Sequence, residues 1–248
     1  MQDWQREQYL LHSKSLRYRK KVAEAEEIVL GGLIHTKNPY IAFSCGKDST
    51  VLAHLVLQQR NIPLRFLSSG ETRILHNVDD VLDWFRARGT TIEEINIDRV
   101  FSPEWQNANW TEQRKAGNKD MDLLNEGDWD GLFMGLRAEE SPPRKLSLYG
   151  HKSEDLPQFC YRYQAGRRRN FIRCCPLARW TTEDVAAYIV AHDLPLLRHY
   201  HNRGMEARTT ARLTGDAVRR YALADIKRDN PDGWRRLVKR FPELRSFS

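Results

Sequence analysis

The sequence has few cysteines and no long hydrophobic run. Four cysteines occur among 248 residues, two of them adjacent, which is too few for the disulfide framework of a small secreted domain. No stretch approaches the roughly 20 uncharged apolar residues that cross a bilayer. The first residues, Met1 to Glu7, are polar and do not form a signal peptide. We therefore expect a cytoplasmic protein with reduced thiols and no membrane partner.

An excess of negative charge is also absent. Lysine and arginine number 40, aspartate and glutamate 33, and the formal net charge is +7. Residues 198–248 contain 13 basic and 6 acidic residues, which accounts for the whole excess. A second cluster, with no carboxylate between residues 160 and 173, consists of Arg162, Arg167, Arg168, Arg169 and Arg173. Such clusters attract DNA or another phosphate-rich partner, although a solvated surface is the alternative.

Hydrophobic periodicity predicts strands that alternate with helices. We expect strands at 39–43, 64–67, 91–97 and 131–134, and helices at 3–35 (one long helix or two joined ones), 50–59, 78–87, 111–126, 181–192, 215–229 and 232–240. This alternation predicts an α/β fold with a Rossmann-like, mostly parallel sheet covered by helices on both faces. After residue 145 the pattern weakens into a Gly-, Pro- and Arg-rich stretch, in which we assign no strand.

The same reading divides the chain into three parts. Residues 1–38 form an N-terminal helical extension, residues 39–197 the α/β domain, and residues 198–248 a basic helical C-terminal part.

A glycine-containing loop follows the first expected strand and precedes a helix. It runs from Ser44 to Thr50 with the sequence Ser-Cys-Gly-Lys-Asp-Ser-Thr. Unpaired backbone N–H groups and the helix dipole favour anions at such a position. Gly46 permits close backbone approach, the serine hydroxyls can donate hydrogen bonds, and Lys47 adds a positive charge. It is not a Walker A loop, because position 41 is isoleucine and an aspartate follows the lysine. An ordinary strand–helix turn capped by aspartate is the alternative.

The loop resembles the Ser-x-Gly-Lys-Asp-Ser signature of the PP-loop ATP pyrophosphatases, and more narrowly their phosphoadenosine-phosphosulfate (PAPS) reductase-like branch. Three further stretches resemble motifs of that branch, in the same order: Phe66 to Thr72, Gly135 to Arg144 and Pro176 to Val185. The resemblance spans about residues 39–205. It implies an adenine nucleotide alpha-hydrolase-like sheet that binds ATP and releases AMP and pyrophosphate.

The resemblance also implies roles for individual residues. It assigns catalysis to Lys47 and Arg137, which stabilise negative charge, and to Asp48, which orients Lys47 or a water on Mg²⁺. The residues expected to contact ATP are Ser44, Cys45, Gly46, Lys47, Asp48, Ser49, Thr50, Leu67, Ser68, Ser69, Gly70, Gly135 and Arg137. The residues assigned to the acceptor substrate are Glu140, Ser141, Arg144, Arg162 and Arg168. ATP and Mg²⁺ are the expected ligands, and no residue is assigned as a metal ligand of the protein. The alternative for Arg137 or Arg144 is a structural ion pair with Glu140.

Two features of sulfonucleotide reductases are missing. No cysteine follows Cys175, so the tail cysteine of the PAPS reductases has no counterpart. The Cys174-Cys175 pair also lacks a downstream Cys-x-x-Cys partner for an iron–sulfur cluster. His199 and His201 match no common zinc-ligand spacing with the cysteines. A sulfate-reducing function is therefore disfavoured.

The remaining cysteines are candidates to carry sulfur. We rank Cys174 first, because it lies beside the Pro-Leu-x-x-Trp motif and the arginine cluster, then Cys160, then Cys45. At a helix N-terminus the pKa of the Cys45 thiol is expected to be depressed. The alternative is that each cysteine is structural.

PP-loop enzymes without a reductase tail activate an oxygen by adenylation so that sulfur or nitrogen replaces it. The chain resembles the branch that serves DNA phosphorothioation (the Dnd and Ssp systems), which implies DNA as acceptor and a cysteine desulfurase as sulfur donor. One alternative is sulfonucleotide chemistry, by a divergent PAPS reductase or an ATP sulfurylase subunit. Another is a non-catalytic module that binds a nucleotide or nucleic acid. The oligomeric state is open, with a homodimer as one option.

Overall fold

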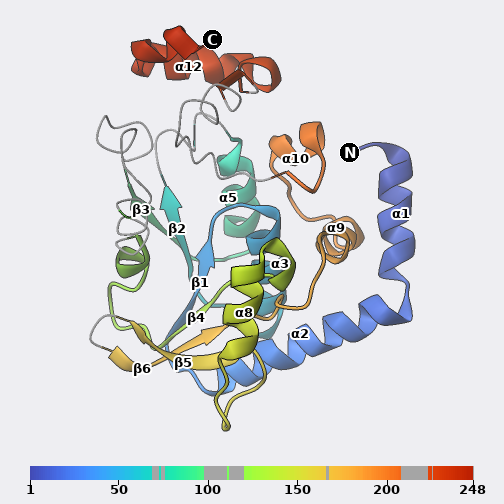
Figure 1. Ribbon diagram of the computed structural model, residues 1–248, viewed down its shortest axis with the longest axis vertical. Helices are drawn as coiled ribbons and strands as arrows, with labels where there is room; N and C mark the ends of the chain where they lie inside the picture. Colours follow the sequence, from blue (N-terminus) through green and yellow to red (C-terminus); the bar gives the residue numbers. More distant parts are fainter. Residues whose placement is uncertain are drawn as a thin grey trace.

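A six-stranded sheet of order β3-β2-β1-β4-β6-β5 forms the centre of the computed structural model (Figure 1). The structure describes residues 1–68, 73, 76–97, 111, 120–165, 168–207, 223–224 and 226–247. The strands are β1 (Pro39–Phe43), β2 (Leu64–Ser68), β3 (Ile92–Asn96), β4 (Gly131–Phe133), β5 (Cys160–Ala165) and β6 (Arg168–Cys174). Neighbouring strands are parallel except β5 and β6. Because β3-β2-β1-β4 is the order of doubly wound α/β folds, the predicted fold class is confirmed.

Most of the helices agree with the predicted ranges except near their ends, but those at Pro142–Gly150 and Arg198–Arg203 were not predicted. They are α1 (Asp3–Ser13), α2 (Leu16–Ile34), α3 (Lys47–Gln59), α5 (Val78–Arg86), α8 (Pro142–Gly150), α9 (Thr182–Ala191), α10 (Arg198–Arg203) and α12 (Pro231–Arg240), with 3-10 turns at Ala138–Glu140 and Pro242–Phe247. Residues 112–119 of the helix expected at 111–126, and residues 215–222 and 225 of the one expected at 215–229, lie outside the described residues. Within the described part of the chain, no helix has the length and apolar character of a membrane span.

One face of the sheet packs against α2, α3 and α5. Phe43 of β1 makes edge-to-face contacts with Phe66 of β2 and Phe85 of α5, at ring-centroid distances of 6.5 and 5.2 Å. All three rings are buried in the main hydrophobic core. Large aromatic side chains contribute much of the apolar surface that a core removes from water. This packing fixes the end of β1, and with it the start of the loop that follows.

The opposite face carries a smaller apolar cluster. Tyr40, Leu132 and Phe171 come from β1, β4 and β6, and Leu124 comes from a helical segment at 120–124. Tyr40 and its neighbour Ile41 belong to different clusters, because successive side chains of a strand point to opposite faces. Both faces of the sheet are therefore covered, as predicted.

The N-terminal helices pack on the body that contains the sheet. Tyr18 and Ile28 of α2 are buried in the main core, and α1 lies beside α9 (Figure 1). Asp184 in the first turn of α9 accepts a hydrogen bond from His12 of α1 at 2.9 Å and pairs with Lys21 of α2. The boundaries predicted at residues 38 and 197 stay predictions.

The β5–β6 hairpin shows that the prediction of no strand after residue 145 is wrong. Arg173 of β6 lies over the Tyr163 ring, 3.9 Å from its centroid, and its Nη1 donates to the Tyr161 hydroxyl at 3.4 Å. Aromatic rings on the neighbouring strand thus cover a charged side chain in a stretch where the sequence pattern indicated no strand. Tertiary contacts thus supply partners for Arg162 and Arg173 within the hairpin.

Candidate nucleotide site

The predicted phosphate loop connects the carboxyl end of β1 to the first turn of α3. The helix begins at Lys47 rather than at the predicted residue 50, and its N-cap residue, Gly46, supplies no side-chain cap. The N–H of Thr50 donates to the Gly46 carbonyl at 2.9 Å. That bond is the first of the helix. The N–H groups of residues 47–49 lie before Thr50 in the first turn, and such groups have no acceptor inside their own helix. Together with the helix dipole they form a favourable place for a phosphate group.

The two loop serines bond to the loop itself. Ser49 Oγ donates to the Gly46 carbonyl at 2.9 Å and lies 3.1 Å from Ser44 Oγ. The backbone N–H of Ser44 donates to Ser49 Oγ at 3.3 Å. These bonds hold the loop in a closed shape, which keeps the first turn of α3 in place. Direct contact of either serine with ATP stays a prediction.

Cys45 has the left-handed backbone conformation of the loop, with φ of 57°. Its side chain is 1% exposed and belongs to the main hydrophobic core. Burial raises the pKa of this thiol, and the nearby Arg73 guanidinium does not offset that effect. The expected depressed pKa is therefore wrong, because the thiol is buried among apolar side chains.

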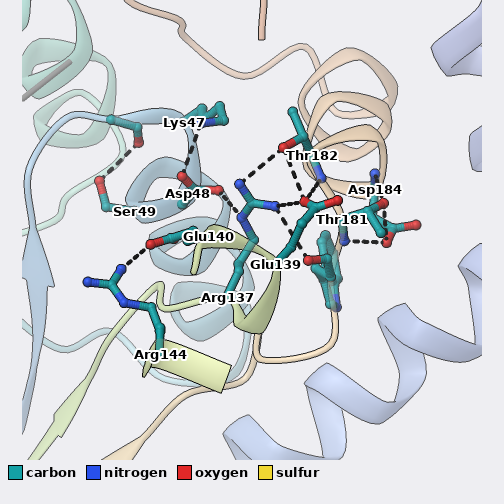
Figure 2. A network of polar contacts seen from close by, with 12 residues as sticks. Lys47, Asp48, Ser49, Arg137, Glu139, Glu140, Arg144, Thr181, Thr182 and Asp184 are labelled. Carbon is teal, nitrogen blue, oxygen red and sulfur yellow. Dashed lines mark hydrogen bonds and ion pairs between the residues drawn. The ribbon is translucent and has the colours of Figure 1, made fainter. Parts of the chain in front are cut away.

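Three charged side chains meet at the start of α3 (Figure 2). Lys47 Nζ lies 3.3 Å from Asp48 Oδ2, and Arg137 Nε lies 2.6 Å from Asp48 Oδ1. Lys47 and Arg137 are only 6% and 3% exposed. A buried cation needs a partner charge, and Asp48 serves both cations at once. The structure thus brings together three of the four residues predicted to be catalytic, the fourth being Cys174.

Arg137 also joins the loop to the start of α9. Its Nη1 donates to the Glu139 carboxylate at 2.6 Å, and its Nη2 donates to Thr182 Oγ1 at 3.2 Å. Glu139 accepts a second bond, from the Thr182 N–H, at 2.7 Å. The motifs at 135–144 and 176–185 therefore meet at one guanidinium (Figure 2). The ion-pair partners of Arg137 are Asp48 and Glu139, and not Glu140 as the structural alternative has it.

Gly135 allows this network to form. A Cβ atom at this position would lie 3.0 Å from both the carbonyl carbon and the carbonyl oxygen of Asp48. Backbone atoms cannot move aside as a flexible side chain can, so the close approach requires glycine. The structure therefore gives Gly135 a packing role, and its predicted contact with ATP stays untested.

The residues predicted to bind the acceptor at 140–144 organise the start of α8. Ser141 is the N-cap residue, and its Oγ accepts the Arg144 N–H at 3.3 Å. Glu140 and Arg144 form an ion pair one helical turn apart. The structural alternative for Arg144 is thus observed, and an additional contact of these residues with an acceptor stays a prediction.

The end of β2 lies at the same edge of the sheet as the loop, because β1 and β2 are parallel. Leu67 is half-buried and Ser68 is buried there. Ser68 Oγ accepts a hydrogen bond from Arg73 Nε at 3.2 Å, so Arg73 is a further cation near this edge that the sequence reasoning missed. Ser69 and Gly70, which were assigned to ATP binding, lie outside the described residues.

The structure does not bring Arg162 and Arg168 to the loop. In the strand register, Arg162 of β5 pairs with Ile172 of β6, and Ile172 pairs with Gly131 of β4. Gly131 in turn pairs with Pro39 at the start of β1. The loop follows the other end of β1, and Arg168 lies still farther from it along β6. Arg162 instead makes a bidentate pair with Asp155, at 2.5 and 2.6 Å. Neither arginine is therefore adjacent to the loop, and their assignment to the acceptor stays a prediction.

The cysteines beside the third motif are core residues. Cys174 is 1% exposed, and its Sγ lies 2.8 Å from the equally buried Cys160 Sγ. Burial, with the Cys160 contact, raises the pKa of the Cys174 thiol well above its ordinary value. Burial also raises the pKa of Cys175, to about 12. Because thiolates are the nucleophilic form, the expectation that Cys174 faces the site as a sulfur carrier is contradicted.

Sequence reasoning also missed Tyr200 of α10. Its hydroxyl accepts the Lys47 backbone N–H at 3.4 Å, and its ring centroid lies 5.2 Å from Lys47 Nζ. Tyr200 follows the boundary predicted at residue 197, so the division into parts separated it from the loop. No spacing rule connects a lone tyrosine to a loop so far away in the sequence.

The curated relatives of this chain include subunits named sulfate adenylyltransferase subunit 2. The protein from Agrobacterium fabrum is 26% identical over 189 residues, which cover 66% of this chain and 57% of the relative. The one from Mycolicibacterium gilvum is 26% identical over 206 residues, which cover 73% and 64%. The chain thus spans less than two thirds of the length of these relatives.

Solved structures and a protein family also match. A PAPS reductase from Candida auris, in a phosphate complex, has 16% identity and a TM-score of 0.46 over 70% of this chain and 81% of its own. An NMN synthetase from Francisella tularensis has 13% identity and a TM-score of 0.45 over 79% and 77%. Both similarities are too low to transfer a site. Residues 38–206 match the phosphoadenosine phosphosulfate reductase domain family, and this match confirms the resemblance predicted from the four motifs. The chain therefore belongs to that family of adenine-nucleotide-using PP-loop proteins.

Proposed function

We propose that this protein cleaves ATP to AMP and pyrophosphate and thereby activates an acceptor oxygen for sulfur incorporation. The observation that supports this most is the convergence of Lys47 and Arg137 on Asp48 at the start of α3. Both cations are buried, and the Asp48 that they share lies in the first turn of α3, directly after the phosphate loop. A bound polyphosphate would meet fixed donors on one side and fixed positive charge on the other.

The chemistry follows from that arrangement. An acceptor oxygen attacks the α-phosphorus, the bond to the bridging α–β oxygen breaks, and pyrophosphate leaves with the electron pair. Lys47 and the loop N–H groups stabilise the negative charge of the leaving pyrophosphate. Arg137 stabilises negative charge on the oxygens of the α-phosphate that is transferred. Asp48 holds both cations in place before the substrate arrives. Such preorganised electrostatics is the main protein contribution to nucleotidyl transfer.

Magnesium fits this site as a companion of the nucleotide. Mg²⁺ is usually bound by substrate phosphates plus one or two carboxylates, with several waters kept. Asp48 is a carboxylate at the loop and would contact the water shell of the ion. Among the described residues no group of three His, Cys, Asp or Glu side chains could hold a metal ion by itself. When bound, the ion would neutralise charge on the phosphates.

For the acceptor we propose a phosphate oxygen of DNA, as in phosphorothioate modification. Support comes from α12, where the exposed residues Arg235, Arg236, Lys239 and Arg240 accompany the buried Trp234, Leu237 and Val238. Figure 1 shows α12 on the side toward which β1 and β2 point, which is the side of the loop. A basic helix on that side suits a polyanionic acceptor.

A persulfide on a partner cysteine desulfurase is the proposed sulfur donor. Each of the four cysteines of this chain is buried, so we place the transferred sulfur on the partner. The terminal sulfur of the partner's persulfide would attack the phosphorus of the adenylated acceptor and displace AMP, and a second thiol would then cleave the S–S bond as reductant to leave the phosphorothioate, without a relay through Cys174.

Pyrophosphate release tests the nucleotide chemistry. The wild type should form AMP and pyrophosphate from ATP, and Lys47→Ala should slow this on the order of 10²-fold or more. Lys20→Ala, at an exposed position of α2, is the matched control and should keep full activity. Formation of ADP and phosphate by the wild type would show that a different bond is cleaved. Absence of any product would favour the non-catalytic binding module.

Salt-dependent DNA binding tests the acceptor. The logarithm of the affinity should fall with the logarithm of salt concentration by about 0.9 per phosphate neutralised. Charge reversal on α12 at Arg235, Arg236, Lys239 and Arg240 should flatten this slope. A matched reversal of the exposed Lys14, Arg17, Arg19 and Lys20 near the start of α2 should change it little. No binding at low salt would remove DNA from the proposal.

The second candidate is sulfonucleotide chemistry, which the sulfate adenylyltransferase subunits among the relatives favour. In that case sulfate, and not DNA, is the acceptor of the adenylyl group. Mass spectrometry of reactions that contain ATP and either sulfate or DNA separates the two, because only one of them would yield adenylyl sulfate.

A further inference from the structure

Helix α10 places a tyrosine at the phosphate loop and is itself held by another part of the chain. The backbone N–H of Arg198 donates to Asn77 Oδ1 at 2.7 Å, next to the start of α5. The His199 ring lies edge-on to His76 with centroids 5.6 Å apart. These contacts fix α10 on the segment before α5, so the position of Tyr200 does not depend on its contact with the loop.

Tyr200 is 3% exposed and meets Lys47 twice. Its hydroxyl accepts the Lys47 N–H at 3.4 Å, and its ring centroid lies 5.2 Å from the Lys47 ammonium. The Lys47 N–H is the first of α3, a donor that a phosphate oxygen at the loop would use. A separation of 3.4 Å is long for an N–H···O bond, so an anionic oxygen would replace the hydroxyl readily.

We propose that Tyr200 completes the diphosphate-binding site of the nucleotide, as a positioning residue that no motif assigns. Without ligand, its hydroxyl occupies the acceptor position at the Lys47 N–H. With ligand, the hydroxyl donates to a diphosphate oxygen, because a tyrosine hydroxyl can accept or donate. Its ring keeps the Lys47 ammonium at the loop by a cation–π contact. The inference rests on the proposed function in that it names the same loop as a diphosphate site.

Binding of inorganic pyrophosphate and of AMP, measured separately by calorimetry, tests the proposal without turnover. Tyr200→Phe keeps the ring and removes the hydroxyl. It should weaken pyrophosphate binding about tenfold or more, as expected for a lost hydrogen bond to a charged group, and leave AMP binding unchanged. Tyr188→Phe is the matched control, since the Tyr188 hydroxyl is also buried but bonds to His54. It should leave both affinities unchanged.

A second variant addresses the ring. Tyr200→Leu should weaken pyrophosphate binding more than Tyr200→Phe, because Lys47 loses its cation–π contact as well. Thermal unfolding of each variant reports whether the fold is kept. A variant that loses pyrophosphate and AMP affinity equally, together with stability, would show a structural role only and overturn the proposal.

Two further results of the calorimetry would decide whether Tyr200 contributes to diphosphate binding. Wild-type pyrophosphate affinity in Tyr200→Phe, or no pyrophosphate binding by the wild type, would overturn the inference. Pyrophosphate binding that depends on Tyr200, in a protein that does not convert ATP to AMP, would uphold it while the proposed function fails.

Discussion

Arg137 Nε lies 2.6 Å from Asp48 Oδ1, and this ion pair connects the segment after β4 to the first turn of α3. Asp48 at the same time lies 3.3 Å from Lys47 Nζ. One carboxylate therefore sets the positions of two buried cations that come from different motifs. Its replacement should affect both the stability of the protein and its chemistry.

Asp48→Asn should lower the rate of AMP formation on the order of 10²-fold, because Lys47 and Arg137 lose the charge that orients them. It should also destabilise the fold by on the order of 3 kcal/mol, since a buried guanidinium loses one of its partner charges. Pyrophosphate release and urea unfolding measure the two effects.

The double variant Asp48→Asn with Arg137→Gln provides the control for that interpretation. If the ion pair is the cause, the double variant should lose less stability than the sum of the two single variants. Strict additivity would show that the two residues do not act through each other.

Gly135→Ala should destabilise the protein by about 1–3 kcal/mol and reduce activity, because a Cβ would press on the Asp48 backbone at 3.0 Å. Gly150→Ala is the matched control, since a Cβ at Gly150, the last residue of α8, would have no atom within 4 Å. Thermal unfolding and pyrophosphate release should separate the two variants. Equal stability of both would contradict the packing role of Gly135.

The His54 ring predicts a dependence of stability on pH. Burial, and next the neighbouring His192, lowers its pKa from 6.5 to about 4, so the folded state favours the neutral ring. Its contribution to the free energy of unfolding is complete above pH 6.5 and is lost as the pH falls toward 4. His54→Gln should therefore flatten this loss in urea unfolding between pH 7.5 and about 4.5. His35→Gln, at an exposed position, should leave the profile as in the wild type.

Cysteine variants should separate packing from sulfur transfer. Cys160→Ala and Cys174→Ala should keep pyrophosphate release and sulfur incorporation, with some loss of stability, because both thiols are buried in the core. Mass spectrometry of DNA from cells that carry each variant measures phosphorothioate. Loss of sulfur incorporation in a variant that still folds and releases pyrophosphate would restore a cysteine relay.

Local patterns were enough to predict much of the fold and the loop of the candidate site. The strand at 39–43 and the Gly-Lys-Asp sequence after it lie within one short segment, so their geometry follows from alternation and from the start of a helix. The four ordered motifs then identified the family, and the resemblance implied that Asp48 and Arg137 serve one site.

Tertiary packing alone decided the rest. The sequence by itself determined the phosphate loop, the start of the helix after it and the alternation of strands with helices, because each depends on neighbours a few positions away. It could not show that Cys174 faces the core, that Arg162 is level with the far end of β1, or that Tyr200 reaches Lys47. These facts depend on strand register and on which distant elements pack together, and local periodicity contains no information about either.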